Sequence, residues 1–344
     1  MKLGFYTHIP LYNKNGYYYT PSYIGLYANN LASNNYISRL TFFGHKANEV
    51  DILHCDYKII NKKINVIELD EKKSAPYRMF FGWIELLKYK YIFKQLDRII
   101  IRVPTPLSIN FRSIISKSKL IYLIVANEYE GARNINLNSL RDYFLKYFLF
   151  LSDLLLRYSS KNLILLVNSP ILLEKYKIYS DSIFLVSTTT VSKNDFYFKK
   201  LKRNKKLKIL FVGRIDPNKG LDVLIESAIN LKLKNINFQI ELVGWEDRNY
   251  SYSIKLRKKI KKFNLENFIT FYGKKKLGPE LYRFYRKSDV FIMPSFNESF
   301  PRTIWEAMAS GCVVIASKVG SIPNLLTHKK NCLLIDRKNS IQLS

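Results

Sequence analysis

Pro294-Ser-Phe-Asn-Glu-Ser-Phe-Pro-Arg-Thr-Ile-Trp-Glu306 joins an apolar run to the opening of a helix. The run before it, residues 290–293, is typical of a buried strand, and residues 303–310 have the pattern of a helix that stops at Gly311. A strand, a loop and a helix in this order are one unit of an open α/β sheet. In such a sheet, ligands bind beside the carboxyl ends of the strands, so this loop is a candidate binding segment.

Two glutamates, Glu298 and Glu306, stand eight positions apart across this junction. The main-chain N–H groups of Ser299, Phe300 and Arg302 would face an anion at the amino end of the helix, where the helix dipole favours negative charge. One carboxylate beside that anion can accept hydrogen bonds from the hydroxyls of a sugar, and the other from those of a ribose. For an isolated pair of glutamates the better interpretation would be two solvated charges on a surface helix.

A second strand, turn and helix lie upstream, in Lys208-Ile-Leu-Phe-Val-Gly-Arg-Ile-Asp-Pro-Asn-Lys-Gly-Leu-Asp-Val-Leu-Ile-Glu-Ser-Ala228. Gly213 allows a tight turn after the strand, and Arg214 and Lys219 place two cations beside that turn. Two cations at the carboxyl end of a strand suit a pyrophosphate. Either cation alone would be an ordinary surface charge, but together with the two glutamates they indicate a ligand site.

Three motifs carry a family resemblance: G-R-x4-K-G, P-S-x2-E-S-F-P-x4-E-A-M-A-S-G and V-x-A-S-x-V-G-x-I-P. In order and spacing they resemble the donor half of retaining GT-B glycosyltransferases of family 4, the glycosyl transferases group 1, over residues 207–337. The resemblance implies two Rossmann-like, doubly wound α/β domains that face each other across a cleft. It also implies that Arg214 and Lys219 bind the donor's diphosphate, Glu298 the transferred sugar and Glu306 the ribose hydroxyls.

The resemblance implies binding roles for three glycines as well. Gly244 and Gly273 follow two further strands of the carboxyl-terminal half, where the family binds the nucleotide. Gly16 belongs to residues 8–23, which we expect to be a loop facing donor and acceptor. His8, in the same loop, fits a packing role and a site role equally well.

Asn127 and Glu128 are the remaining catalytic candidates. They follow an apolar run, residues 120–126, that predicts a strand ending at the cleft. Many members of the family place a histidine or an acid near this position, close to the reacting carbon. This sequence has no histidine there, so the two polar residues are offered in its place.

The length of the chain, 344 residues, predicts two domains. We assign residues 1–194 to an amino-terminal, acceptor-side domain and residues 208–344 to a nucleotide-sugar-binding domain. Residues 195–207 carry many lysines and arginines, which repel one another and stay solvated, and are the predicted linker. The family normally continues for tens of residues beyond the position where this sequence ends, so we expect a truncated carboxyl end.

The formal net charge of +29 has three interpretations. Coding bias is the preferred one, because Lys, Asn, Ile and Tyr are abundant together. The second is attraction to an anionic membrane, where each basic residue near the surface contributes about 1 kcal/mol. The third is nucleic acid, but the sequence has no recognition motif, so no nucleic-acid partner is expected.

The number of cysteines and the distribution of apolar residues indicate the cellular compartment of the protein. Three cysteines without paired spacing favour a reducing compartment and argue against a zinc site or a disulfide framework. No run of apolar residues reaches the length of about 18 that a membrane span requires, and the first residues lack the apolar core of a signal peptide. We therefore expect a cytoplasmic protein that is peripheral on the inner face of the plasma membrane.

Two segments of the amino-terminal half are rich in aromatic residues. Residues 77–94 alternate them with lysines and arginines, which fits an interfacial membrane helix or a helix that packs its aromatics into the core; we prefer the core. Residues 141–158 predict a buried helix that is too polar to span a bilayer.

These observations predict a hexosyltransferase-type enzyme. It would move a sugar from a nucleoside diphosphate sugar to a hydroxyl of a glycan or lipid-linked acceptor, with retention, in the biosynthesis of surface polysaccharide or glycolipid. No cofactor and no metal are expected, because Arg214 and Lys219 would neutralise the leaving diphosphate. The alternative is a catalytically impaired basic binding protein that keeps the GT-B fold.

Overall fold

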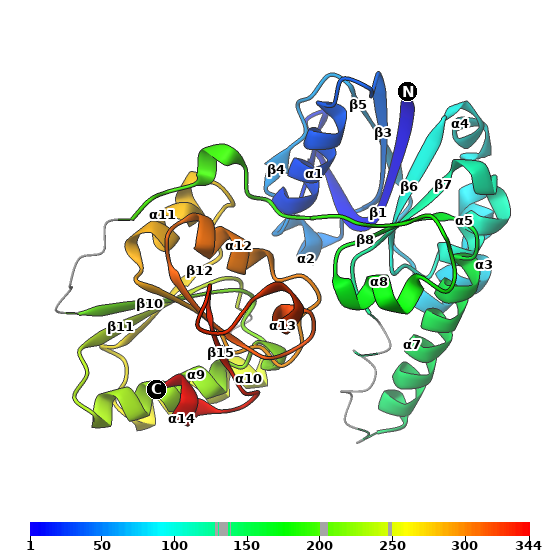
Figure 1. Ribbon diagram of the computed structural model, residues 1–344. Helices are drawn as coiled ribbons and strands as arrows, with labels where there is room; N and C mark the ends of the chain where they lie inside the picture. The colour runs from blue at the N-terminus through cyan, green and yellow to red at the C-terminus, as the bar shows by residue number, and fades with distance from the viewer. Residues whose placement is uncertain (128–129, 131–136, 138, 200–205, 247–249) are drawn as a thin grey trace. The chain divides into compact units, whose positions relative to one another are not determined.

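The computed structural model describes residues 1–344 except 128–129, 131–136, 138, 200–205 and 247–249 (Figure 1). Contacts divide the chain into two compact units, Met1–Thr188 and Thr189–Ser344. The contacts place residues 189–194 with the second unit, whereas the sequence assigned them to the first. The predicted linker stays a prediction, because part of it lies outside the described residues.

The first unit is built on a parallel sheet in the order β5-β3-β1-β6-β7-β8-β9. Its strands are β1 (Lys2–Lys14), β3 (Arg39–Lys46), β5 (Ile64–Leu69), β6 (Arg98–Val103), β7 (Leu120–Ile124), β8 (Ile164–Val167) and β9 (Ile183–Leu185), and β2 (Tyr17–Thr20) and β4 (Tyr57–Lys58) add antiparallel pairs beside β1. The helices are α1 (Ser22–Ala32), α2 (Glu49–Ile52), α3 (Ala75–Leu87), α4 (Lys90–Gln95), α5 (Ser108–Ile114), α7 (Leu140–Ser159) and α8 (Pro170–Tyr176), with the 3₁₀ turn η1 (Lys117–Lys119).

The sheet of the first unit is covered on both faces. Phe5 of β1 packs in a cluster with residues of α1, while its neighbour Tyr6 packs in another with residues of α3, α5, α7 and α8. Phe42 and Phe43 of β3 separate in the same way. Successive strand residues point to opposite faces, so apolar runs without alternation give a sheet buried on both sides.

The predicted loop of residues 8–23 is wrong. Strand β1 continues to Lys14, and β2 pairs with it antiparallel, with Lys14 opposite Tyr17. Asn15 and Gly16 form the turn with φ values of 51° and 76°. An Asn-Gly pair between strand-like runs is the strongest local signal for a two-residue hairpin, because both positions need positive φ. Gly16 is therefore the turn residue of a hairpin.

The second unit contains a six-stranded sheet in the order β12-β11-β10-β13-β14-β15, and every adjacent pair is parallel. The strands are β10 (Leu207–Val212), β11 (Phe238–Val243), β12 (Ile269–Gly273), β13 (Val290–Met293), β14 (Val313–Ser317) and β15 (Leu333–Ile335). The helices are α9 (Leu221–Leu233), α10 (Ser251–Lys262), α11 (Pro279–Lys287), α12 (Arg302–Ala309), α13 (Ile322–Leu325) and α14 (Ser340–Leu343), with the 3₁₀ turns η2 (Lys193–Asp195) and η3 (Pro217–Lys219).

Two predictions of buried aromatic helices are wrong. Residues 77–94 form two helices, α3 and α4, and α3 buries one narrow stripe, including Met79 and Leu86, while Phe80, Phe81 and other large apolar side chains on it are exposed. Helix α7 likewise buries few apolar side chains, among them Phe148 and Leu156. An apolar composition does not place every side chain in the core, because one helix face packs on the sheet and the other does not. Within the described residues, no helix has the length and apolar character needed to cross a membrane.

Candidate functional site

The strand order of the second unit locates the candidate site. Strands β10, β11 and β12 lead away from the centre in one direction, and β13, β14 and β15 lead away in the other. The order therefore reverses between β10 and β13, and at such a point the loops leaving the two strands separate and open a crevice where ligands bind. The loops after β10 and β13 are the two segments that the sequence singled out.

The loop after β10 is pressed against the loop after β13. Gly220 has a φ of 66°, and a Cβ at this position would lie 2.0 Å from the carbonyl oxygen of Pro294. The main-chain N–H of Phe296 donates to the carbonyl of Asn218 at 2.7 Å. A glycine is required here for both its backbone conformation and its small size, and the G-R-x4-K-G motif supplies it.

Lys219 and Glu298 form the central contact of the site. The Nζ of Lys219 lies 2.6 Å from Oε1 of Glu298, and the two side chains are 24% and 11% exposed. The main chain of Glu298 is also fixed, because its carbonyl accepts from the N–H of Ser321 at 3.2 Å and a Cβ on Gly320 would come within 1.7 Å of it. The ion pair joins the loops that follow β10 and β13, and the hydrogen bond from Ser321 attaches the loop that follows β14.

Glu306 lies inside helix α12 and is only 4% exposed. Its Oε1 accepts from the hydroxyl of Thr190 at 2.7 Å, and its Oε2 accepts from the hydroxyl of Tyr285 at 2.8 Å. Burial, and then the nearby Glu306, raise the pKa of Tyr285 well above its ordinary value, so the phenol keeps its proton and donates. Each carboxylate oxygen has capacity for a further bond.

These positions decide against the interpretation of Glu298 and Glu306 as two solvated surface charges. The predicted roles of the two glutamates, on sugar and ribose, stay predictions. Thr190 and Tyr285 were missed by the sequence reasoning. They lie 116 and 21 positions from Glu306 and belong to none of the three motifs.

Arg214 is the exposed member of the predicted site. Its side chain is 74% exposed, and its Nε lies 3.5 Å from Oδ2 of Asp216 in the same loop. Asp216 also accepts from the N–H of Asn218 at 3.0 Å, which caps the short turn η3. Arg214 therefore projects from the rim of the loop, whereas Lys219 is partly enclosed.

Helix α12 presents its amino end to the same loop. It begins at Arg302, one residue before the predicted start, and its N-cap residue, Pro301, supplies no side-chain cap. Phe300 stacks on Trp305 of the first helical turns, with ring centroids 5.9 Å apart. The predicted use of the N–H groups of Ser299, Phe300 and Arg302 by an anion stays a prediction.

Three glycines line the carboxyl edge of the sheet. The N–H of Gly213 donates to Val243 at 3.0 Å, and that of Gly244 donates to Gly273 at 2.9 Å. A Cβ on Gly244 would lie 1.7 Å from the carbonyl oxygen of Gly213, while a Cβ on Gly273 would meet nothing within 4 Å. Gly244 is thus required by packing, and Gly273 adopts a positive φ of 68° in open space.

The remaining candidates, Gly16, Asn127 and Glu128, come from the amino-terminal part of the sequence. Asn127 accepts a hydrogen bond from Nζ of Lys175 at 2.7 Å, and Lys175 is held in turn by Asp153 at 2.6 Å. Glu128 lies outside the described residues. Gly16 is in the hairpin, as stated above. The catalytic and binding roles of these residues stay predictions.

The described residues contain no group of three or more His, Cys, Asp and Glu side chains that could hold a metal ion. The expectation of a reaction that needs no metal stays a prediction.

Comparisons with known proteins bear on the family and the fold of this chain. Residues 192–344 match the family model of the glycosyl transferases group 1. Over 128 residues, which are 37% of this chain, the sequence is 32% identical to the D-inositol 3-phosphate glycosyltransferase of Pseudarthrobacter chlorophenolicus, and it spans 30% of that protein. It is 29% identical to protein CapJ of Staphylococcus aureus over 283 residues, which are 76% of this chain and 66% of CapJ.

Among solved structures, the chain is similar to Anabaena HepE in complex with UDP and glucose. The TM-score is 0.69 at 17% identity, and the match covers 100% of this chain and 88% of that one. The likeness to glycosyltransferase structures shows a GT-B fold with two Rossmann-like, parallel-sheet domains, which confirms the predicted fold class. Together, these matches support a group 1 glycosyltransferase.

Proposed function

From the match of residues 192–344 to the glycosyl transferases group 1, we propose that this protein transfers a hexose-type sugar from a nucleoside diphosphate sugar to an acceptor hydroxyl, with retention. The acceptor class is a glycan or a lipid-linked saccharide of surface polysaccharide or glycolipid biosynthesis. The solved structure of HepE is a complex with UDP and glucose, and this likeness supports a nucleotide-sugar donor.

The observation that carries the proposal is the contact of Lys219 with Glu298 at the point where the strand order reverses. The diphosphate of a donor would bind Lys219, Arg214 and the amino end of α12. As the glycosidic bond breaks, negative charge grows on the leaving diphosphate. Fixed cations and main-chain dipoles stabilise that charge more than they stabilise the bound donor, which lowers the barrier.

Glu298 would orient the sugar in this mechanism. Released from part of its contact with Lys219 by the incoming phosphate, its carboxylate accepts hydrogen bonds from sugar hydroxyls. Retention follows if the acceptor hydroxyl attacks from the face that the diphosphate leaves. The departing phosphate oxygen then takes the proton of the attacking hydroxyl.

Turnover of variants tests the proposal. Lys219→Ala and Arg214→Ala should each lower the rate of donor consumption by about 10²-fold, because each removes a cation that acts in the transition state. The slow hydrolysis of UDP-, GDP- and ADP-sugars without acceptor is measured first, to identify the donor. Lys259→Ala is the matched control. It removes the same charge, and Lys259, on α10, pairs with Glu226 of α9 and belongs to none of the site's loops. Equal rates in the wild type and both site variants would contradict the site.

Calorimetry separates the enzyme from the alternative, a basic binding protein that keeps the fold. The enzyme should bind one nucleoside diphosphate saturably, and Glu306→Ala should abolish that binding because the carboxylate would hold the ribose. Anionic polymers should compete poorly. Binding of any polyanion irrespective of its base, unchanged in Glu306→Ala, would favour the binding protein.

Peripheral contact of the first unit with an anionic membrane on the cytoplasmic side is part of the proposal. Helix α7 carries exposed apolar side chains at helical spacing, Leu140, Tyr143, Phe144, Tyr147, Leu154 and Tyr158. They form a second apolar stripe beside the buried one, where a surface helix normally carries polar residues. Aromatic residues and cations on such a helix suit the boundary between lipid headgroups and acyl chains.

A further inference from the structure

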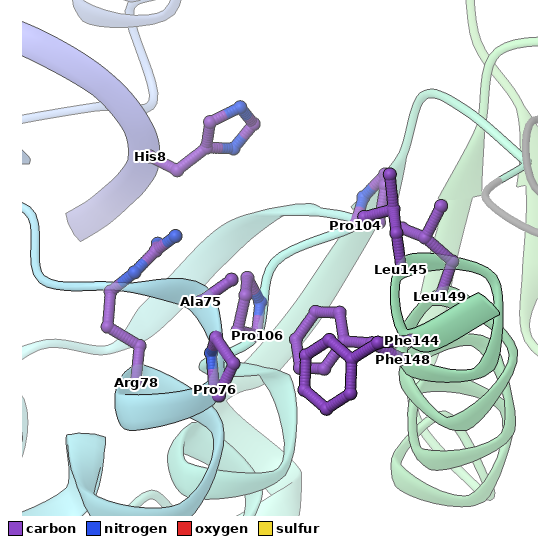
Figure 2. A pocket seen from close by; sticks show the side chains of 10 residues that line it. All are labelled: His8, Ala75, Pro76, Arg78, Pro104, Pro106, Phe144, Leu145, Phe148 and Leu149. Carbon is purple, nitrogen blue, oxygen red and sulfur yellow. The ribbon is translucent and has the colours of Figure 1, made fainter. Parts of the chain in front are cut away.

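A pocket of about 330 Å³ lies within the first unit, and none of the residues assigned to the donor lines it (Figure 2). Its wall is formed by β1, the start of α3, the segment after β6 and the first turns of α7. Figure 2 shows the ring of His8 and the guanidinium of Arg78 at one end and the side chains of α7 at the other. The pocket therefore has a polar end and an apolar end.

Arg78 is a buried cation with an unused donor. Its side chain is 5% exposed, and its Nε donates to the carbonyl of Lys73 at 3.0 Å. Its Nη1 is buried and has no partner among the described residues. Buried guanidinium donors are normally satisfied, because leaving one unpaired costs its full desolvation energy. The polar end of the pocket thus lacks an acceptor.

His8 adds a second unused polar atom, since its Nδ1 is also buried without a partner in the described part of the chain. Burial, and then the positive charges of Arg102, Lys72 and Arg78, lower the pKa of His8 to about 3. The imidazole is therefore neutral at pH 7, and one ring nitrogen can donate to an anion.

The charges around this end are predominantly positive. Burial, and then the positive charge of Arg78, lower the pKa of Lys72. Glu85 is a carboxylic acid whose charge acts on Arg78 and raises the pKa of the guanidinium. Burial raises the pKa of Glu85 itself. Asp51 acts on Lys72 more weakly than Arg78 does. The positive charges of Arg102, Lys72 and Arg78 that act on His8 favour an anionic ligand there.

The opposite end of the pocket is apolar. Phe144, Leu145, Phe148 and Leu149 of α7 face it (Figure 2). Phe144 and Leu145 are also exposed on the surface of the helix. The apolar wall is thus continuous with the exposed side chains of α7, and a chain or ring lying against it could extend toward that surface.

We propose that this pocket binds the phosphate group of an amphiphile, with the phosphate on Arg78 and His8 and the apolar part against α7. The Nη1 of Arg78 and the Nδ1 of His8, both without a partner in the described part of the chain, would each donate to an oxygen of the phosphate. On the proposed function, and only if that function holds, the ligand is the phosphate-bearing lipid portion of the acceptor. The binding itself does not depend on catalysis.

Hexyl phosphate is the probe, used with the whole chain in calorimetry. Inorganic phosphate and hexanol provide the two halves of the probe separately. Hexyl phosphate should bind more tightly than either. Inorganic phosphate binding as tightly as hexyl phosphate would assign the pocket to free phosphate and overturn the amphiphile, and hexanol binding equally well would overturn the anion site.

Two variants locate the binding. Arg78→Met should weaken hexyl phosphate by about 10-fold or more, the loss expected for a hydrogen bond to a charged group. Arg112→Met, in the same unit, is the matched control, because Arg112 donates to the carbonyl of Lys161 and does not line the pocket. Leu145→Ser should weaken hexyl phosphate but leave inorganic phosphate unchanged. Equal affinities in wild type, Arg78→Met and Leu145→Ser would overturn the proposal.

Histidine resonances in the wild type give a readout that needs no variant. A bound phosphate adds negative charge beside His8 and should raise its pKa from about 3. An unchanged His8 titration at saturating hexyl phosphate would contradict the contact. Nucleoside diphosphate binding is measured in the same samples. If hexyl phosphate binds and no nucleoside diphosphate does, only the proposed function is refuted. If a nucleoside diphosphate binds and hexyl phosphate does not, only the proposed pocket ligand is refuted.

Discussion

Lys219 and Glu298 lie 79 positions apart in the chain, yet their charged atoms are 2.6 Å apart. Such an ion pair holds each side chain in one orientation before any ligand arrives. An incoming diphosphate therefore competes with Glu298 for Lys219, and the sugar takes up the carboxylate that is released. The proposed donor would thus replace one ion pair by two contacts, of its diphosphate with Lys219 and of its sugar with Glu298.

Two glycines with similar backbone angles should respond differently to alanine. Gly16 and Gly220 have φ values of 76° and 66°. Of the two, only Gly220 faces a backbone atom, because a Cβ there would lie 2.0 Å from the carbonyl oxygen of Pro294. Gly16→Ala should cost about 1 kcal/mol from left-handed strain. Gly220→Ala should cost about 3 kcal/mol or more, because a clash adds to the strain. Urea unfolding of both variants measures the difference, and equal losses would contradict the close contact.

His45 makes the first unit sensitive to acid. Its Nε2 lies 3.0 Å from the hydroxyl of Tyr6 and its Nδ1 lies 3.1 Å from the carbonyl of Asp70, which suits a neutral ring with the proton on Nδ1. Burial lowers its pKa to about 4 in the folded protein. The unfolded chain takes up a proton near pH 6.5, so the stability that the neutral ring contributes is complete above that pH and is lost as the pH falls toward 4.

The free energy of unfolding should therefore fall by roughly 2 kcal/mol between pH 7 and pH 5 on account of His45. His45→Gln should lack this part of the decrease, even if the variant is less stable at pH 7. His8, whose pKa is also lowered, contributes with the same sign and remains in both proteins. Urea unfolding at the two pH values checks the prediction, and identical pH dependence in the two proteins would count against a neutral buried ring.

At the scale of elements, Asp153 joins α7 to α8. Its carboxylate is 1% exposed and lies 2.5 Å from Arg157 of the same helix and 2.6 Å from Lys175 of α8. Asp153→Ala would leave two cations facing each other without the acid, and should cost about 3–5 kcal/mol. Glu174→Ala removes the exposed partner of Lys177 and should cost less than about 1 kcal/mol. Thermal unfolding compares the two, and similar small losses would show that the buried acid is dispensable.

The elements show how far a sequence can be interpreted. Strand β13 spans Val290–Met293 as predicted. The parallel sheet of the second unit was predictable because each strand is followed by a turn residue and a helix. The hairpin at Asn15 was missed although its turn signal was present. Helix α7 was misjudged because composition cannot tell which apolar face meets the sheet. The contacts of Glu306 with Thr190 and Tyr285 could not be predicted, since they depend on three-dimensional packing alone.

At the scale of the whole molecule, the net charge of +29 bears on membrane contact. The protein should sediment with vesicles that contain anionic lipid and not with neutral ones, and binding should weaken in about 0.5 M salt, where screening shortens the range of the attraction. Replacing Tyr147 and Leu154 of α7 by serine should reduce the binding, because insertion of apolar side chains is lost.

Phe198→Ser is the control for that experiment, since Phe198 is an exposed aromatic residue in the second unit. Undiminished sedimentation of the α7 variant would exclude this helix from the contact. Equal binding to neutral and anionic vesicles would show that the positive charge of the protein does not drive the membrane contact.

The tight approaches of Gly220 to Pro294 and of Gly320 to Glu298 restrict how this unit can be re-engineered. A chimera could take residues 294–301 from another protein in order to change the donor. The main-chain carbonyls at positions 294 and 298 would then have to fit against Gly220 and Gly320 of this chain. Such a graft should succeed only when the segments containing Gly220 and Gly320 are transplanted together with it. The three loops should therefore be exchanged together, because replacing one of them alone would disturb the close contacts that fix the backbone of the other two.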